Sequence, residues 1–218
     1  MRIQLSIVLA LVFALAAPFD TARAADDDLS VNARLVLAAR NNDAAGVERA
    51  LKGGASPNSR NRLGETALLI ALKRNDVAMA RTMLDAGTDV NIAAVNGVTP
   101  LMAAAYGGQT EMAELLLARG ANIDAVDRLN KNAMTYAAGE GRTQVVTLFC
   151  AKGVDPNAVY HNNLTALMWA AGEGRTATVK ALLAAGAKPG LKDNRGKTAL
   201  DMAREGQYAE VVALLESA

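Results

Sequence analysis

The sequence predicts an all-α repeat solenoid, and three observations support that fold class. A short motif recurs at a constant interval of 33 residues, as Thr66-Ala67-Leu68, Thr99-Pro100-Leu101, Asn132-Ala133-Met134, Thr165-Ala166-Leu167 and Thr198-Ala199-Leu200. A glycine column keeps the same register, at Gly54, Gly87, Gly120, Gly153 and Gly186. An alanine column does so too, from Ala38 to Ala203. A fixed period of this length is typical of arrays in which each unit buries its apolar side against its neighbours.

Each unit carries the signals for two short helices. In the copy around Thr99, that side chain can accept a backbone hydrogen bond at the start of a helix, and Pro100 suits the first helical position. Gly108 suits the left-handed residue that ends this first helix. A second helix follows with apolar residues three and four positions apart, as a helix buried on one side requires. Gly120 then ends the second helix.

The connection between units is predicted to be a tight turn. Its tip holds only glycine or asparagine, at Gly64, Gly97, Asn130, Asn163 and Gly196. These residue types tolerate a positive φ, which hairpin turns require. The degenerate first copy has Val31 at this register, so we expect no matching hairpin at its start.

The chain divides into a signal, a leader and an array. Residues 1–24 are predicted to be a cleavable secretory signal peptide, because Arg2 precedes an apolar run and small residues flank Arg23 before the cleavage point. The alternative is a membrane anchor, but the run is shorter than the roughly 20 apolar residues that a spanning helix needs. Residues 25–29 form an acidic leader. We therefore expect export, with the periplasm as the compartment.

Residues 30–218 are predicted to form the repeat array. We expect a degenerate first copy at 30–60, full copies near 61–93, 94–126, 127–159 and 160–192, and a capping copy at 193–218. Polar outer residues in the first and last copies indicate caps. Without residues 1–24 the chain has equal numbers of basic and acidic residues, which argues against nucleic acid and against a polybasic membrane surface.

The copy at 94–126 resembles the ankyrin repeat. Thr99-Pro100-Leu101-Met102-Ala103-Ala104 is similar to the family signature Thr-Pro-Leu-His-x-Ala, and Gly120-Ala121-Asn122-Ile123-Asp124 is similar to the ending Gly-Ala-Asp-Val-Asn. The likeness extends over about residues 30 to 218. It implies about six units, each a β-turn followed by two antiparallel helices.

The resemblance also implies a function. Ankyrin proteins bind other proteins through the turn tips and the first-helix surface without catalysing a reaction. An exported member would resemble periplasmic ankyrin proteins, some of which are associated with oxidant resistance, so a supporting role in oxidative-stress defence is implied. The signature histidine is absent from every copy, where Leu69, Met102, Thr135, Met168 and Asp201 replace it. We expect this change to remove a hydrogen bond between turn and helix and to lower stability.

The residues that vary between copies are the candidates for partner binding, because the scaffold does not dictate them. Arginine and tyrosine are over-represented among residues that carry binding energy. The candidates are Arg62, Leu63, Lys73, Arg74, Tyr106, Arg128, Leu129, Lys131, His161, Leu164 and Arg195. Tyr136 and Trp169 share a column with Ile70 and Ala103, and we interpret them as packing between adjacent first helices.

No catalytic arrangement is found in the sequence, so we expect no enzyme activity, cofactor or metal site. Cys150, the only cysteine, falls on an apolar core column, whereas His161, the only histidine, falls at a turn tip. A nucleophilic pair needs hydrogen-bond reach. The expected partner is a protein, bound by a monomer that is not inserted in a membrane after signal cleavage. Two alternatives stay open: a ligand-binding or redox-active protein that uses Cys150, Tyr160 and His161, and a structural envelope spacer.

Overall fold

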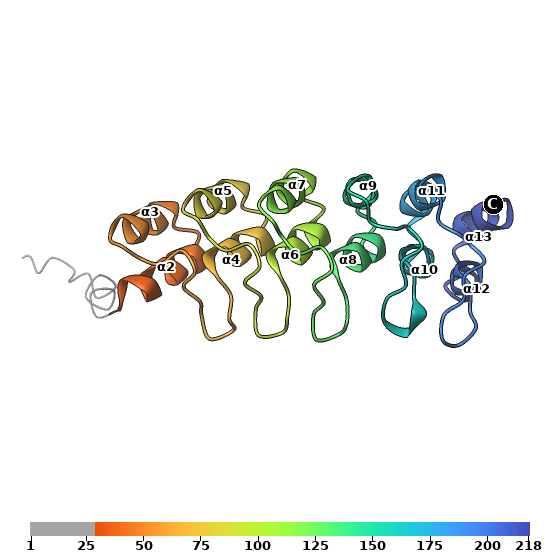
Figure 1. Ribbon diagram of the computed structural model, residues 1–218, viewed down its shortest axis with the longest axis horizontal. Coiled ribbons are helices and arrows are strands. Elements are labelled where there is room, and N and C mark those ends of the chain that lie inside the picture. Colours follow the sequence, from red (N-terminus) through yellow and green to blue (C-terminus); the bar gives the residue numbers. More distant parts are fainter. Residues whose placement is uncertain (1–28) are drawn as a thin grey trace, which may run out of the picture.

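The structure, a computed structural model, describes residues 29–218. The predicted signal peptide, 1–24, and almost all of the predicted leader lie outside the described residues. The described part contains twelve α-helices and one short 3-10 helix, η1 (His161–Asn163). It contains no strand, only one isolated antiparallel bridge between Arg60 and Thr66. Figure 1 shows the helices stacked as pairs in one elongated array, which confirms the all-α repeat solenoid.

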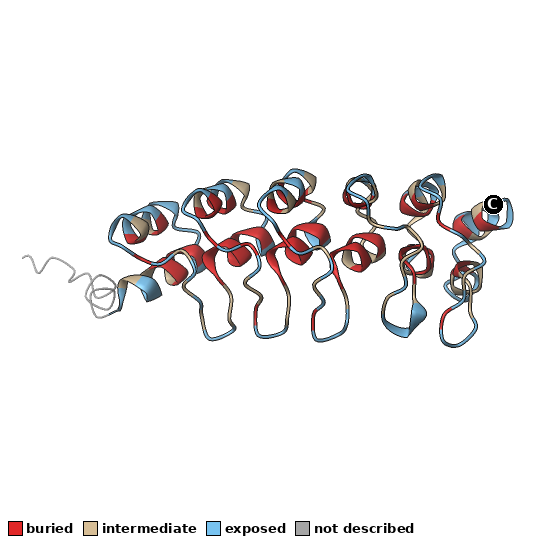
Figure 2. Ribbon diagram, viewed as in Figure 1, coloured by how far each residue is buried: buried red, intermediate tan, exposed pale blue. Residues whose placement is uncertain are grey.

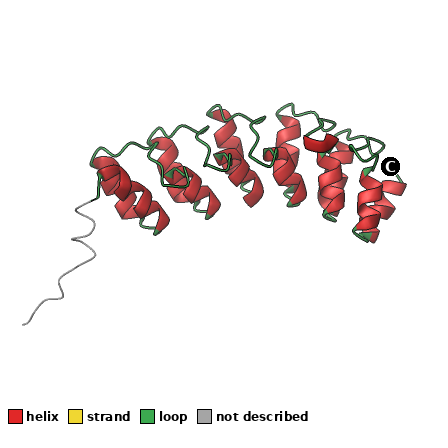
Figure 3. Cartoon of the chain, turned by 90° about the horizontal axis from the view of Figure 1, so that it is seen from below, coloured by secondary structure: helices red, strands yellow, loops and turns green. Residues whose placement is uncertain are grey.

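The helices lie in two rows. The first helices of the pairs are α2 (Val31–Arg40), α4 (Ala67–Lys73), α6 (Pro100–Gly107), α8 (Ala133–Gly139), α10 (Ala166–Gly172) and α12 (Ala199–Glu205). The second helices are α3 (Ala44–Lys52), α5 (Val77–Asp85), α7 (Thr110–Ala118), α9 (Thr143–Ala151), α11 (Thr176–Ala184) and α13 (Ala209–Glu216). Long loops before α4, α6, α8, α10 and α12 extend past the first row, away from the second row (Figure 1). Figure 3 shows that the array curves along its length.

The core runs without interruption from pair to pair. The alanine column belongs to this core, and Ala71, Ala104, Ala137, Ala170 and Ala203 are fully buried. A methyl group is the only side chain at these positions, so neighbouring helices can approach closely. The buried side of each helix faces its neighbours, as Figure 2 shows. Burial between copies therefore adds to the packing of the two helices within each copy and stabilises the fold.

The predicted tip column is confirmed. Gly64, Gly97, Asn130, Asn163 and Gly196 all have φ between 56° and 85°. The first copy lacks the hairpin, as expected, because α2 begins at Val31 itself. At the equivalent of Gly108 in the last copy, Gln207 takes the left-handed conformation with φ 58°, although Gly206 precedes it. The repeat register therefore decides the backbone there, against the preference of the residue.

The expected loss of a turn-to-helix hydrogen bond is wrong in four of the five copies. There the residue in place of the signature histidine accepts a hydrogen bond from the backbone N–H of the residue that caps the first helix. The acceptors are Sδ of Met102 at 3.4 Å, Oγ1 of Thr135 at 3.0 Å, Sδ of Met168 at 3.5 Å and Oδ2 of Asp201 at 2.9 Å. Leu69 has no polar atom and cannot accept one. In these four copies a side-chain hydrogen bond therefore joins the turn to the helix without the histidine, although the two thioether sulfurs are weak acceptors.

The second helices begin in two different ways. Asp43 and Asp76 cap their own helices, through backbone N–H groups at 2.8 and 2.9 Å. At the same register the next three copies carry long side chains that donate to a carbonyl in the first helix of the copy before. These donors are Gln109 to Leu72 O at 2.6 Å, Arg142 to Tyr106 O at 2.8 Å and Arg175 to Gly139 O at 2.8 Å. In the middle of the array, a bond within one copy is thus replaced by a bond between copies.

Replacing Gly97 with Ala tests the contact between successive hairpins. A Cβ at Gly97, where φ is +85°, would lie 2.8 Å from the Cα of Asp127 in the next hairpin. Gly120 has the same φ, but a Cβ there meets nothing within 4 Å. Both variants bear the cost of a left-handed alanine, about 1 kcal/mol. We expect Gly97→Ala to lower the free energy of unfolding by at least about 1 kcal/mol more than Gly120→Ala in urea. Equal losses would contradict the contact.

The carboxylate of Asp201 makes stability depend on pH. Hydrogen bonds from the backbone N–H and the hydroxyl of Thr198 hold the pKa of Asp201 below its ordinary value of 3.8. Because the folded pKa is the lower one, this stabilisation is present above about pH 4 and is lost as the pH falls through the folded pKa. We expect Asp201→Asn to unfold at lower urea than the wild type at about pH 7, with the difference vanishing near pH 2.

The control is Asp124→Asn, which changes an exposed carboxylate that does not cap a helix. A difference between wild type and Asp201→Asn that stayed constant across the pH range would rule out the charged cap.

Candidate functional site

The five long loops and the exposed ends of the first helices form one surface, which we call the hairpin face. It comprises residues 60–65, 93–98, 126–131, 159–164 and 192–197, with the exposed side chains at the ends of α4, α6, α8, α10 and α12. Figure 1 shows the loops side by side. Three backbone hydrogen bonds join neighbouring loops: Val95 N to Leu63 O at 2.8 Å, Arg128 N to Asn96 O at 3.0 Å and Asn194 N to Asn162 O at 2.9 Å.

All eleven partner-binding candidates lie on the hairpin face. Nine are exposed: Arg62, Leu63, Lys73, Arg74, Tyr106, Arg128, Leu129, His161 and Arg195. Lys131 and Leu164 are half-buried. Leu63 and Leu129 are 63% and 68% exposed, although both are large and apolar. The structure thus brings the candidates together on one surface, and their contact with a partner stays a prediction.

Three of the basic candidates already have structural partners. Lys73 pairs with Glu65 at 2.7 Å, and Arg195 pairs with Asp193 at 2.8 Å. Burial alone would raise the pKa of Glu65, but the hydrogen bonds from Lys73 and Asn61, together with the charge of Lys73, outweigh it and hold that pKa below its ordinary value. Arg74 donates to a backbone carbonyl of the preceding copy at 3.3 Å. These three side chains therefore contribute to the scaffold as well as to the surface.

Three consecutive first helices each place one aromatic ring on the hairpin face. The rings of Tyr106 and Tyr136 meet edge to face, with centroids 6.0 Å apart. The Nζ of Lys131 lies 4.6 Å from the centroid of Trp169 and 5.6 Å from that of Tyr136. Our interpretation of Tyr136 and Trp169 as packing between first helices was incomplete, because both are half-buried and flank a cation on the surface. One aromatic residue in each of three successive helices was the sequence signal that could have found this row.

A buried carboxylate fixes this part of the face. Asp127 is only 6% exposed, and its Oδ1 accepts from the backbone N–H groups of Leu129 and Lys131 at 2.8 and 2.9 Å. Its Oδ2 accepts from the hydroxyl of Tyr136 at 2.6 Å. Burial, followed by this hydrogen bond, raises the pKa of Tyr136, so the hydroxyl stays protonated and keeps donating. One residue therefore holds the loop, the ring and the backbone from which Lys131 extends.

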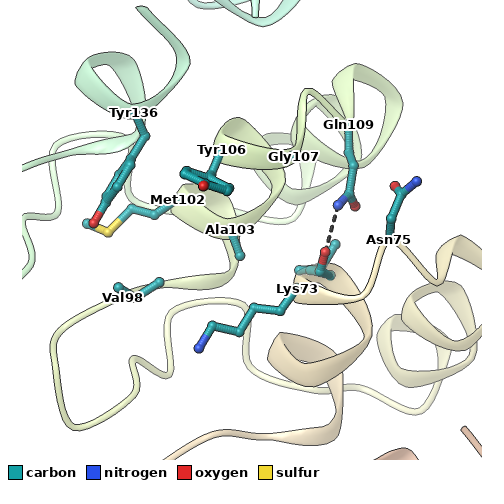
Figure 4. A pocket seen from close by; sticks show the side chains of 10 residues that line it. Lys73, Asn75, Val98, Met102, Ala103, Tyr106, Gly107, Gln109 and Tyr136 are labelled. Atoms are coloured by element: carbon teal, nitrogen blue, oxygen red, sulfur yellow. Dashed lines mark hydrogen bonds between the residues drawn. The ribbon is translucent and has the colours of Figure 1, made fainter. Parts of the chain in front are cut away.

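An apolar cavity of about 430 Å³ lies beside the aromatic row. Its lining includes Val98, Met102, Ala103, Tyr106 and Tyr136, as Figure 4 shows. Most of the lining is carbon, which suits an apolar side chain better than a charged group. Several of the lining residues belong to the hairpin face, so the cavity is part of that surface.

One end of the cavity is formed by Gln109 (Figure 4). This side chain is almost fully buried, and its Nε2 donates to Leu72 O in the preceding first helix at 2.6 Å. Its Oε1 has no hydrogen-bond partner among the described residues. The bond to Leu72 ties the cavity wall to two successive copies.

The residues considered for redox chemistry lie on different elements. Cys150 is in α9 and is half-buried, not fully buried as expected, and burial raises the pKa of its thiol. His161 is exposed in η1, and burial raises the pKa of Tyr160. Within residues 29–218, no three His, Cys, Asp or Glu side chains are grouped so as to hold a metal ion. None of the helices in that range is long and apolar enough to cross a membrane.

Comparison with known families agrees with this architecture. A family model described as ankyrin repeats (3 copies) matches residues 35–127, 84–160 and 134–218, and these overlapping matches together reach from residue 35 to residue 218. No match is found among the curated proteins. Ankyrin repeats are protein-interaction modules and are generally not catalytic. The geometry of the pairs and the family match lead to one conclusion: the chain belongs to the ankyrin repeat family.

Proposed function

We propose that this chain is a non-catalytic, monomeric scaffold that binds a protein partner on its hairpin face. The supporting observation is a line of exposed apolar side chains on successive loops. Leu63, Val95 and Leu129 are 63%, 53% and 68% exposed, and backbone hydrogen bonds join the loops that carry them. None of the three belongs to the core. Adjacent exposed apolar side chains that a fold does not need are typical of interaction surfaces.

The charge of the hairpin face supports the same proposal. Its five loops contain seven lysines and arginines but three aspartates and glutamates, whereas the whole chain has a net charge of only +1. Two of the three acids, Asp127 and Asp193, are buried, and the third, Glu65, is half-buried and paired. The loops therefore present positive charge to solvent. Such a surface attracts acidic partners over distances of about 10 Å at ordinary salt.

The triple variant Tyr106→Ala, Arg128→Ala, Leu129→Ala tests this surface. Affinity purification with crosslinking would identify the partner, and its dissociation constant would then be measured by calorimetry. We expect the triple variant to bind at least about tenfold more weakly, because it removes an aromatic, a cationic and an aliphatic contact.

The matched control replaces three exposed residues of the second-helix row, as Arg81→Ala, Glu111→Ala, Thr147→Ala. We expect the control to bind as the wild type does. If the first triple variant bound as tightly as the control, the partner would lie elsewhere on the molecule.

We further propose that the protein is exported to the periplasm after cleavage before Ala25. The support is the layout of residues 1–24, which lie outside the described residues. We expect N-terminal sequencing of the protein from cell fractions to begin at Ala25. Replacing Ala22 and Ala24 with bulky residues should retain the full-length precursor, because signal peptidase needs small side chains there. Protein that began at Met1 and stayed in the cytoplasm would contradict export.

Within the proposed function, the partner would belong to oxidative-stress defence, a suggestion supported only by the resemblance to periplasmic ankyrin proteins. Direct redox chemistry by the chain itself is less well supported. The raised pKa of Cys150 keeps its thiol protonated, and a protonated thiol is a poor nucleophile. We therefore place the chemistry of such a defence in the partner and the docking in this chain.

A further inference from the structure

Residues of two columns of the hairpin face form an ion pair in the second copy and another in the last copy. Each pair joins the last loop residue before a first helix to a residue eight positions later, at the end of that helix. In the second copy Glu65 pairs with Lys73 at 2.7 Å. In the last copy Lys197 pairs with Glu205, with the charges exchanged between the columns. These positions therefore lie close enough for direct contact, whichever of them carries the acid.

The fourth copy, near 127–159, has only one residue of this pair. Lys131 stands at the position of Lys197, but Gly139 stands where Glu205 supplies the carboxylate. No carboxylate within residues 29–218 pairs with Lys131, and this includes Glu140, the residue after the glycine. The copies on either side carry apolar residues at the loop position, Val98 and Leu164. In the last copy the equivalent lysine, Lys197, is paired with a carboxylate. Lys131 has no such partner in the part of the chain that the structure describes.

The surroundings of Lys131 strengthen its attraction for a carboxylate. The residue is half-buried, and its ammonium lies between the rings of Trp169 and Tyr136. The rings attract the cation but cannot accept its hydrogen bonds as a carboxylate does. A charge-assisted hydrogen bond in such a partly dry position is stronger than one in open water. The backbone of Lys131 is already fixed by Asp127, so little order would be lost on binding.

The space for the missing acid is open. A Cβ built at Gly139 meets only the Cε3 of Trp169 at 3.7 Å, an ordinary contact. Beyond Tyr136 the apolar cavity of about 430 Å³ continues along the same face toward Tyr106. The ammonium of Lys131 and the apolar cavity therefore lie in adjacent copies, with the ring of Tyr136 between them, and a bound ligand could contact both.

We propose that Lys131 binds a carboxylate from an acidic segment of a protein partner, in the place that Glu205 occupies beside Lys197. An apolar side chain of the same segment enters the cavity beside Tyr106. A carboxylate is the expected anion because Glu205 fills this place in the last copy, and because Glu65 pairs with Lys73 across the same two columns in the second copy. A protein segment supplies the apolar side chain as well. The inference rests on the proposed function, since it names the partner chemistry of the hairpin face.

The probe is a library of random twelve-residue peptides selected on the purified protein. We expect the enriched peptides to contain Asp or Glu close to Leu, Ile, Met or Phe. Each binding peptide is then compared with its twin in which Glu or Asp is replaced by Gln or Asn. On the wild type, the acidic peptide should bind at least about tenfold more tightly than its twin, with an advantage that shrinks at high salt.

Two variants distinguish binding by Lys131 from nonspecific binding of the peptides. Lys131→Met removes the ammonium but keeps the length of the stem. Gly139→Glu supplies the missing acid from within the chain and should occupy the lysine. On both variants we expect the acidic peptide and its amide twin to bind equally. The matched control is Gly172→Glu, which adds the same side chain at the end of α10, where Leu164 stands in place of the lysine and a Cβ meets only Met202 at 3.8 Å. This control should keep the acidic preference.

The outcomes distinguish this inference from the proposed function. Peptides that lose affinity for the Tyr106, Arg128 and Leu129 triple variant but bind equally with acid or amide would overturn the inference and leave the function standing. An acidic preference that survived both Lys131→Met and Gly139→Glu would overturn it as well. Peptides that bound the triple variant as tightly as the wild type would contradict the function itself. A library that gave no binder would also overturn the inference, because a short segment is its stated occupant, while the function keeps its own partner test.

Discussion

The close approach of consecutive first helices is the constraint on which the rest of the structure depends. Each first helix from α4 to α12 carries one fully buried alanine of the 33-residue column, whose side chain is a single methyl group. The helix spacing in turn sets the spacing of the loops, which is short enough for Val95 N to reach Leu63 O at 2.8 Å. A bulkier residue in the alanine column would separate the helices and the loops together. The continuity of the hairpin face therefore depends on how closely the first helices pack.

Much of the fold could be predicted because its determinants are local. A threonine before a helix, a glycine after it and an asparagine at a tight turn act within a few residues, and the constant period shows that they repeat. The loss of the signature histidine was misjudged for a physical reason. Whether Met102 or Asp201 can accept the N–H that the histidine would have served depends on side-chain rotamers. Sequence spacing does not determine rotamers.

The candidate site was predicted only in part. Exposed residues such as Leu63 and Leu129 were found because the scaffold leaves them free to vary. The half-buried rings of Tyr136 and Trp169 were assigned to packing, because whether a ring is covered depends on the size of its neighbours. Small residues such as Gly139 leave these rings open to solvent. The bond from Tyr136 to Asp127 joins a helix to a loop nine positions earlier, and no local pattern indicates it.

The two ways in which the second helices begin have a consequence for how the array opens. Helices α3 and α5 are capped by their own Asp43 and Asp76, so no side chain at this register bonds the second copy to the first. Helices α7, α9 and α11 begin at residues bonded to the copy before them, so opening one copy breaks a bond held by its neighbour. In a linear chain of nearest-neighbour couplings, the weakly coupled end melts first. Because α13 also begins without such a bond, fraying would proceed from the two end copies, while the stretch with the aromatic rings stays closed as a single cooperative block.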